Sequence, residues 1–201
     1  MYTLYFDGAC EPYNPGGIAT WGVVLYEDKN IIYKNCGLAC EPFSLKASNN
    51  LAEYTALIKG SDQCLNRGIE TLTIRGDSQL VIRQMTGEYR VGSTNIIPLY
   101  EEAYRLVNSF KKVSFEWVER ERNSVADELS KQAYYNSVNS YLPVGQTGVA
   151  QARMPFGKYK GKGIEWLTTN KPHYVDWLIE QDWLRKELKE FLEGVRSVRR
   201  T

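Results

Sequence analysis

The stretch Thr3-Leu4-Tyr5-Phe6-Asp7-Gly8-Ala9 decides the fold expected of this chain. Its alternation predicts a first β-strand, and the Asp7-Gly8 step places a carboxylate at the C-terminal end of that strand. Two further strands are predicted at 20–26 and 31–38. Because only a short polar connection joins these two strands, we expect an antiparallel meander.

After this meander, the pattern of apolar residues changes to helical spacing from Asn50, and Gly68 is expected to end the helix. Glu53 lies near the start of this helix. The rest of the pattern comprises a strand at 71–75 that runs into Asp77, helices at 79–85 and 95–110, a strand at 113–118, and a helix at 124–135. This order predicts an α/β fold with a mixed five-stranded sheet flanked by helices.

The size of the chain indicates one domain with an appendage. It has 201 residues, 43% of them hydrophobic, which is ample for a packed core. The longest apolar runs are strand-length, far below the roughly 18 residues of a membrane span, so we expect no membrane insertion. The first residues carry no basic segment or cleavage site typical of secretion, which favours the cytoplasm. We also expect a monomer without an organic cofactor.

Charge is unevenly distributed along the chain. Residues 1–149 hold 14 Lys and Arg against 17 Asp and Glu, a balance of −3, whereas residues 150–201 hold 11 against 7, a balance of +4. We therefore predict a catalytic domain at 1–136, a linker at 137–152 and a small basic α+β domain at 153–201. The basic segment either supplies affinity for phosphate or is a solvated charged helix, and charge alone does not decide between them.

The four cysteines do not predict a zinc site, because they lack paired spacing and the one histidine, His173, lies far away in sequence. We expect small unpaired thiols. A disulfide between Cys36 and Cys40 stays open for a hyperthermophilic source.

Four acidic residues occupy places where a fold brings chain segments together: Asp7, Glu53, Asp77 and Asp127. Converging carboxylates repel each other and raise each other's pKa values, a penalty that divalent cations remove. Oxygen ligands without histidine or thiolate suit Mg²⁺ or Mn²⁺, and two such ions would support phosphodiester hydrolysis. Each acid alone has an ordinary alternative as a helix cap or a surface charge.

The surroundings of these acids also resemble a family, type 1 ribonuclease H, over residues 1–136. The resemblance implies that Asp7, Glu53, Asp77 and Asp127 bind two metal ions and that the products are 5′-phosphate and 3′-hydroxyl ends. The motifs that carry it, in order, are Tyr5-Phe6-Asp7-Gly8-Ala9-Cys10, Asn14-Pro15-Gly16, Ser48-Asn49-Asn50-Leu51-Ala52-Glu53, Gly76-Asp77-Ser78-Gln79-Leu80 and Asn123-Ser124-Val125-Ala126-Asp127-Glu128-Leu129-Ser130.

The same resemblance implies an RNA/DNA hybrid as the substrate. This family recognises the 2′-hydroxyls of RNA in the minor groove. Asn14, Asn49 and Gln79 match positions that make such contacts, and Asn50 is expected to face the DNA strand. The alternatives are a turn former for Asn14 and a helix cap for Asn49 or Asn50.

Two departures from the family pattern affect the expected site. The stretch at 87–92 replaces a lysine-rich protrusion and contains one basic residue, so affinity for the hybrid must come from elsewhere. The loop before Asp127 lacks the histidine that some relatives use in product release or proton transfer. We hypothesise that Glu121 or Arg122 fills part of that role.

The C-terminal segment resembles the small domain that follows some exonucleases of the exonuclease X kind. Helices are expected from Asn170 with Pro172 and at 183–192, and the alternating lysines either clamp phosphate or form a solvated turn. Lys158, Lys160 and Lys162 are expected on one side of an extended segment, with Tyr159 on the other. The expected core consists of Phe156, Trp166, Tyr174, Trp177, Leu178, Trp183, Leu184 and Leu188.

The sequence thus predicts an endonuclease that cuts the RNA strand of RNA/DNA hybrids. Two alternatives stay open, a nuclease acting on DNA or double-stranded RNA, and a non-catalytic hybrid-binding module. The four acids argue against the binding module, because confining negative charge near phosphates weakens binding.

Overall fold

The computed structural model describes residues 1–11, 14–42, 44–140, 154, 158–159, 161–181 and 192. The chain forms two compact units, Met1–Tyr134 and Tyr135–Thr201, which are described separately below.

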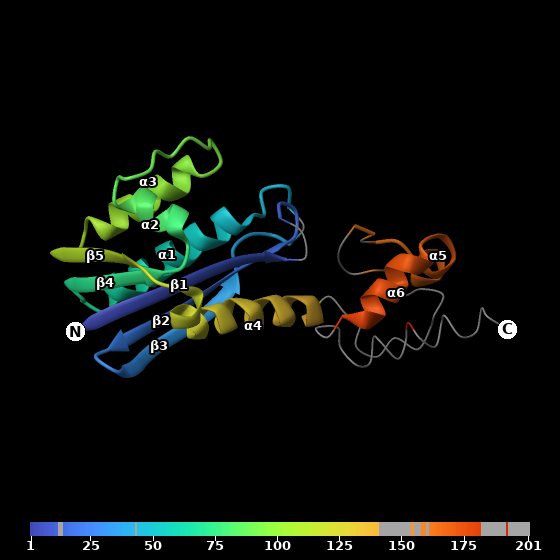
Figure 1. The fold of residues 1–201 in the computed structure, drawn as a ribbon, viewed down its shortest axis with the longest axis horizontal. Coiled ribbons are helices and arrows are strands. Elements are labelled where there is room, and N and C mark those ends of the chain that lie inside the picture. Colours follow the sequence, from blue (N-terminus) through green and yellow to red (C-terminus); the bar gives the residue numbers. More distant parts are fainter. Residues whose placement is uncertain are drawn as a thin grey trace. The chain divides into compact units, whose positions relative to one another are not determined.

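The first unit is built on the predicted mixed sheet, whose strands lie in the order β3-β2-β1-β4-β5. The first strand is central and pairs antiparallel with β2 and parallel with β4 (Figure 1). The β2–β3 pair is antiparallel and the β4–β5 pair is parallel. The strands are β1 (Tyr2–Glu11), β2 (Ile18–Glu27), β3 (Asn30–Leu38), β4 (Thr71–Gly76) and β5 (Lys112–Trp117).

Helices cover both faces of this sheet, which explains why β2 is buried from Ile18 to Leu25. Three helices lie on one face and α4 lies on the other (Figure 1). The helices of this unit are α1 (Asn49–Asn66), α2 (Gln79–Met85), α3 (Ile97–Val107) and α4 (Ser124–Ser140), and a 3-10 turn, η1 (Arg120–Asn123), precedes α4.

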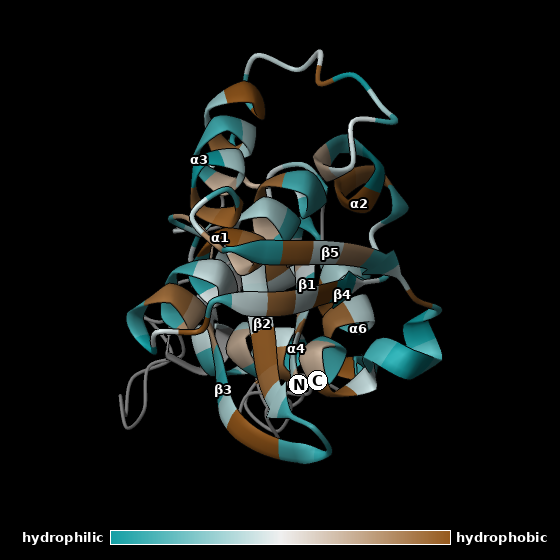
Figure 2. Ribbon diagram, turned by 90° about the vertical axis from the view of Figure 1, so that its left-hand side faces the viewer, coloured by the Kyte–Doolittle hydropathy of each residue, from teal (hydrophilic) through white to brown (hydrophobic). Residues whose placement is uncertain are grey.

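The larger core lies between the sheet and the helices α1 to α3, and apolar segments of these elements face one another in Figure 2. Leu4, Phe6, Tyr54 and Leu57 are completely buried there. A smaller cluster joins the other face of the sheet to α4. It consists of Val24 from β2 and of Ala126 and Leu129 from α4. The alternation of β1 therefore turns Leu4 and Phe6 to the larger core and leaves Tyr5 and Asp7 on the α4 side.

Helix ends differ from the sequence expectation in two places. The helix expected at 95–110 is shorter, Ile97–Val107, with Pro98 in its first turn. In contrast, α4 continues to Ser140, past the expected end at residue 135 and into the predicted linker. No glycine or proline occurs between residues 136 and 140, so nothing in that stretch breaks the helix.

The second unit contains two described helices, α5 (Ile164–Asn170) and α6 (Pro172–Glu180). The start of α6 at Pro172 agrees with the prediction, whereas α5 was not predicted. It has seven residues and no side-chain cap at Gly163, while α2, which is equally short, starts at the cap Ser78. The helix expected at 183–192 lies outside the described residues, apart from Leu192.

The aromatic core expected for this unit is wrong at two positions. Trp166 is 41% exposed and Trp177 is 37% exposed. Leu178 is buried as expected. Among the described residues of this unit, the fully buried side chains are all non-aromatic: Met154, Leu167, Val175, Leu178 and Leu192. The expected core residues Phe156, Trp183, Leu184 and Leu188 lie outside the described residues.

All four cysteines are free, including Cys36 and Cys40. Among the described residues, none of the helices is long and apolar enough to cross a membrane.

Candidate active site

The site begins where β1 passes directly over α1. Gly8 makes this approach possible, because a Cβ atom at residue 8 would lie 2.2 Å from the backbone nitrogen of Glu53. The second turn of α1 is therefore held against the C-terminal half of β1, which carries Asp7. The N-terminus of α1 is fixed by Ser48, whose Oγ accepts a hydrogen bond from the backbone nitrogen of Leu51 at 3.3 Å.

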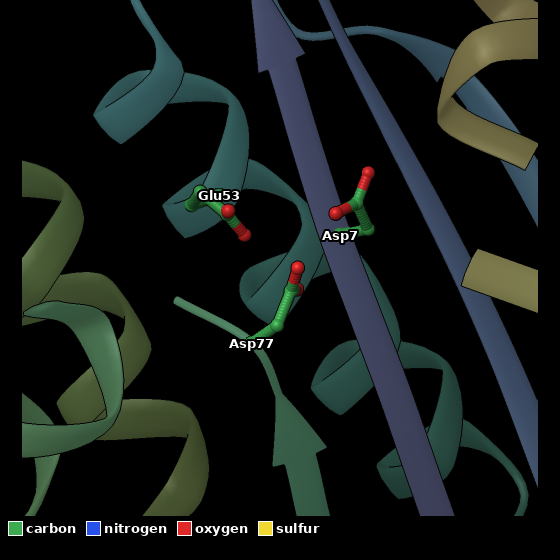
Figure 3. Close-up of side chains that lie close together, drawn as sticks. All are labelled: Asp7, Glu53 and Asp77. Atoms are coloured by element: carbon green, nitrogen blue, oxygen red, sulfur yellow. The ribbon is translucent and has the colours of Figure 1, made fainter. Parts of the chain in front are cut away.

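Three carboxylates converge at this place. Asp7 comes from β1, Glu53 from α1 and Asp77 from the residue after β4, and their side chains point toward one another (Figure 3). One oxygen from each lies within 4.8 Å of the others. The parallel pairing of β1 and β4 brings Asp77 here, because both strands end at the same edge of the sheet.

The surroundings of Asp7 and Glu53 disfavour the charged forms of these two acids. Asp7 is 5% exposed, and burial, together with the charges of Asp77 and Asp127, raises its pKa to about 6 despite a hydrogen bond from Ser130. Burial, with the charges of Asp7 and Asp77, raises the pKa of Glu53 well above its usual value. The cluster is therefore electrostatically unfavourable when all its members are ionised.

Neighbouring side chains hold two of these acids in place. Asn123, 1% exposed, donates through Nδ2 to Asp77 Oδ1 at 2.7 Å and to the carbonyl oxygen of Phe6 at 2.9 Å. Ser130 Oγ donates a hydrogen bond to Asp7 Oδ2. Asn123 thus ties the segment after β4 to β1, and Ser130 ties α4 to Asp7.

The fourth predicted acid, Asp127, is occupied by ion pairs. Arg120 Nη2 donates to Asp127 Oδ1 at 2.6 Å, and Lys131 Nζ donates to Asp127 Oδ2 at 2.5 Å. Burial raises the pKa of Asp127, but these two cations outweigh burial and lower it. Asp127 lies in the first turn of α4 as predicted, and its charge reaches Asp7, but it does not join the cluster of three.

This arrangement suits a divalent cation. Glu53 Oε2 is buried and has no hydrogen-bond partner, so this acid of the cluster has an unsatisfied oxygen that can bind a cation. The set of donors is entirely carboxylate oxygen, which is the chemistry that Mg²⁺ and Mn²⁺ prefer. A cation among Asp7, Glu53 and Asp77 would offset both the repulsion and the unsatisfied oxygen.

The predicted substrate-binding asparagines lie around the start of α1. Asn14 Oδ1 accepts a hydrogen bond from the backbone nitrogen of Asn49 at 3.1 Å, which links the loop after β1 to this helix. Asn14 and Asn50 line a cavity of about 430 Å³ together with Ser48 and Asn95. Because Ser48 is the cap of α1, the alternative role of Asn49 or Asn50 as the cap is wrong.

The remaining predicted residues of the first unit lie on its surface. Gln79 is exposed at the start of α2. Glu121 and Arg122 are exposed in η1, and Arg122 lines a cavity of about 350 Å³ with Tyr5 and Arg75. Two residues of this turn bind acids of the site, Arg120 to Asp127 and Asn123 to Asp77, and the sequence predicted neither contact.

Where the structure describes the predicted lysine segment, at 158–159 and 161–162, it forms a turn and a bend and not an extended strand. Lys158 and Lys162 are exposed, and Lys160 lies outside the described residues. Tyr159 was expected on the side opposite Lys158. Instead, Lys158 Nζ lies 5.7 Å from the centroid of the Tyr159 ring.

A five-stranded mixed sheet with acids on β1, on α1 and after β4 is the architecture of a ribonuclease H-like domain, although Asp7 lies within β1 and not at its C-terminal end as expected, because the strand continues to Glu11. The chain belongs to the ribonuclease H-like family, because a family model described as reverse transcriptase-like matches residues 5–133.

Several known proteins are similar to this chain. The "Bifunctional protein Rv2228c" of Mycobacterium tuberculosis is 34% identical over 120 residues, which is 60% of this chain but only 32% of that protein. The structure of RNase H1 from Halobacterium salinarum is 32% identical, with a TM-score of 0.61, covering 67% of this chain and 98% of the other. LC11-RNase H1, solved in complex with RNA/DNA hybrid, is 26% identical with a TM-score of 0.61, covering 69% and 99%. The resemblance of the first unit to ribonuclease H is thereby confirmed.

Proposed function

We propose that this chain is an endonuclease that hydrolyses the RNA strand of RNA/DNA hybrids and leaves 5′-phosphate and 3′-hydroxyl ends. The observation that carries the proposal is the convergence of Asp7, Glu53 and Asp77, with an oxygen of each within 4.8 Å of the others. The similar Halobacterium protein named "Ribonuclease HI" and the hybrid complex of LC11-RNase H1 support the choice of substrate.

Asp7, Glu53 and Asp77 would hold two Mg²⁺ or Mn²⁺ ions, and Asp127 would complete the set once it leaves Arg120 or Lys131. When bound, two such ions activate the attacking water and stabilise the leaving oxygen. The protein contributes the fixed positions of the carboxylates. Ser130 orients Asp7, Asn123 orients Asp77, and the backbone nitrogen of Gly8 donates to Glu53.

Recognition of the hybrid would fall to polar groups around the start of α1 and α2. Asn14, Asn49 and Gln79 would contact ribose 2′-hydroxyls, and Asn50 would face the DNA strand. Support comes from the cavity of about 430 Å³ beside Asn14 and Asn50, whose other lining residues include Ser48, Ser93 and Thr94. Hydroxyl and amide groups of this kind distinguish ribose from deoxyribose by hydrogen bonding.

In this proposal the catalytic domain is 1–136, 137–152 is a linker, and 153–201 resembles the exonuclease X C-terminal domain. The small domain would supply phosphate contacts through Lys158, Lys160 and Lys162, in place of the lysine-rich protrusion that the stretch at 87–92 lacks. Auxiliary roles for Glu121 or Arg122, a cytoplasmic location and a monomeric state stay predictions.

The substrate is tested by comparing three duplexes of one sequence with Mg²⁺ or Mn²⁺: RNA/DNA hybrid, DNA and RNA. We expect cleavage of the hybrid alone, in its RNA strand. Cleavage of DNA or of double-stranded RNA at a comparable rate would replace the proposed substrate. Metal-independent binding of the hybrid without cleavage would support a hybrid-binding module instead.

The phosphate contacts are tested by the double variant Lys158→Gln/Lys162→Gln in the full chain. Because each lost phosphate contact lowers the salt dependence of binding, the slope of log affinity against log salt should fall by roughly 0.7 to 0.9 per lysine. Lys34→Gln/Lys59→Gln, which removes two exposed lysines of the first unit, is the matched control. An unchanged slope in the first variant would exclude the lysines from hybrid binding.

A further inference from the structure

The second unit carries a connected chain of four aromatic rings outside its buried core. Ring centroids are 6.2 Å apart for Trp166 and Tyr159, 4.9 Å for Tyr159 and Tyr174, and 5.6 Å for Tyr174 and Trp177. The rings come from the turn at 158–159, from α5 and from α6. We call this set the aromatic strip.

The aromatic strip is not needed to fill the core of the unit. Met154, Leu167, Val175 and Leu178 are each at most 1% exposed and already form the buried interior. Tyr159 and Tyr174 are half-buried, while the indoles at the two ends of the strip keep more than a third of their surface exposed. Large aromatic surface that stays in contact with water in a small unit indicates an interaction site.

Cations lie beside these rings. Lys162 Nζ is 5.3 Å from the centroid of the Trp166 ring, and Lys158 Nζ is 5.7 Å from that of Tyr159. Lys171, between α5 and α6, is also exposed. The surface therefore offers flat aromatic faces together with ammonium groups that can neutralise phosphate.

We propose that the aromatic strip binds single-stranded nucleic acid, with an unpaired base on each exposed indole and backbone phosphates at Lys158 and Lys162. Rings with adjacent cations match the chemistry of a strand whose bases are unpaired, because every base has a stacking face and every nucleotide carries a negative charge. Paired bases inside a duplex do not expose these faces. The proposal extends the nucleic-acid role proposed for the second unit, but it does not depend on hydrolysis by the first.

The probe is a fluorescein-labelled oligothymidylate of about 15 nucleotides, a length that can occupy one small binding unit. Its fluorescence anisotropy is measured with the full-length protein in EDTA. We expect Trp166→Ala and Trp177→Ala each to weaken binding roughly 5- to 100-fold, because a stacked base contributes about 1–3 kcal/mol. Trp166→Phe and Trp177→Phe should restore most of the affinity, since phenylalanine keeps a stacking face.

The matched control is Tyr104→Ala, which removes an exposed aromatic ring that stacks on Tyr100 in the first unit. It should bind as the native chain does. Equal affinity of the native chain and both tryptophan-to-alanine variants would overturn the proposal. So would native binding of a DNA duplex as tight as that of the single strand.

A second test uses a variant that keeps all four rings, so that a loss of binding cannot be due to misfolding caused by a missing ring. Lys162→Gln should lower the slope of log affinity against log salt by roughly 0.7, the value for one phosphate of a single strand. Lys34→Gln should leave it unchanged, and an unchanged slope for Lys162→Gln would also overturn the proposal. Cleavage of a blunt hybrid is measured in parallel. If the protein cleaves the hybrid but does not bind the oligothymidylate, only the single-strand site is refuted. If it binds the oligothymidylate but does not cleave the hybrid, only the proposed nuclease function is refuted.

Discussion

Arg120 would compete with metal for Asp127, the proposed fourth ligand beside the carboxylate cluster. Its guanidinium occupies Oδ1 of Asp127, although its side chain is 67% exposed. We expect Arg120→Ala to tighten Mn²⁺ binding by roughly 5-fold, since an exposed ion pair contributes at most about 1 kcal/mol. Titration of Mn²⁺ followed by electron paramagnetic resonance measures this. Arg105→Ala, which removes an exposed arginine of α3, is the control, and weaker metal binding in Arg120→Ala would refute the competition.

In contrast to Arg120, Asn123 should favour metal binding, because its hydrogen bond holds Asp77 in place. Asn123→Ala removes the bonds to Asp77 and to the carbonyl of Phe6. We expect Mn²⁺ affinity to fall 10- to 100-fold, the usual effect of losing a residue that supports a ligand, and the free energy of unfolding to fall by about 1–3 kcal/mol. Asn66→Ala, at the exposed end of α1, should change neither. Native metal affinity in Asn123→Ala would show that Asp77 needs no such support.

The acids could be found from the sequence, but the residues that hold them could not. Asp7, Glu53 and Asp77 each stand in a motif at the expected end or start of an element, although Asp7 and Glu53 are buried and β1 continues beyond Asp7. Asn123 and Ser130 act on acids 46 and 123 residues away, and no local pattern encodes such a bond. The pairing of Asp127 with Arg120 was missed for a different reason. Three charged residues follow one another in this loop, Arg120, Glu121 and Arg122, and the sequence does not show which of them contacts Asp127.

At the scale of elements, the packing of β1 on α1 sets the position of Glu53. Gly8→Ala would place a Cβ 2.2 Å from the backbone of Glu53, and backbone atoms cannot move aside as a flexible side chain can. We expect α1 to shift, the protein to lose about 1–3 kcal/mol or more of unfolding free energy, and metal binding to weaken. Urea unfolding and Mn²⁺ titration measure the two effects.

Gly92→Ala is the matched control for Gly8→Ala. A Cβ at residue 92 meets nothing within 4 Å, so the substitution should change neither stability nor metal binding. Native behaviour of Gly8→Ala in both measurements would mean that the contact between β1 and α1 is not as tight as the structure indicates.

Elements with clear alternation or helical spacing were predictable, and so was the short helix α2, whereas α5 was not. The five strands and α1 agree with the sequence expectation to within a few residues, since alternation and helical spacing are clear there. In the second unit, the seven-residue α5 escaped detection. The exposure of Trp166 and Trp177 was also missed, because composition favours burial of aromatic rings and only packing shows that aliphatic side chains already fill the interior.

For the molecule as a whole, the acid cluster links stability to pH. The pKa of Asp7 is raised from 3.8 to about 6, so the folded state keeps a proton that the unfolded state releases. The stability that this proton contributes is present below about pH 4 and is lost as pH rises through about 6. Asp7→Asn should therefore be more stable than the native protein in EDTA at neutral pH, by on the order of 1–3 kcal/mol.

This effect is measured by urea unfolding of both proteins in EDTA at about pH 4.5 and about pH 7.5, on either side of the titration. The difference in unfolding free energy between the two proteins should grow with pH. Groups remote from position 7 cancel, and the variant also lacks the repulsion between Asp7 and Glu53. Saturating Mn²⁺ should stabilise the native protein and reduce the advantage of the variant. A variant less stable than the native protein at the higher pH would contradict the account.

The two parts of the chain also differ in net charge. The weakly acidic first part contains the carboxylate site, and the basic C-terminal part contains the lysines beside the aromatic strip. The sequence predicted this division, but it could not choose between a phosphate-binding surface and a solvated helix. That choice depends on which side chains remain at the surface.

We propose that the carboxylate cluster of Asp7, Glu53 and Asp77 cuts the RNA strand of a hybrid. This proposal is tested most directly with a hybrid labelled separately on each strand, incubated with Mg²⁺ or Mn²⁺ and either the native protein or Asp7→Asn. We predict metal-dependent cleavage of the RNA strand by the native protein and loss of cleavage in the variant, which should still bind the hybrid. Binding by the native protein without cleavage under either metal, or cleavage that survives in Asp7→Asn, would contradict the account.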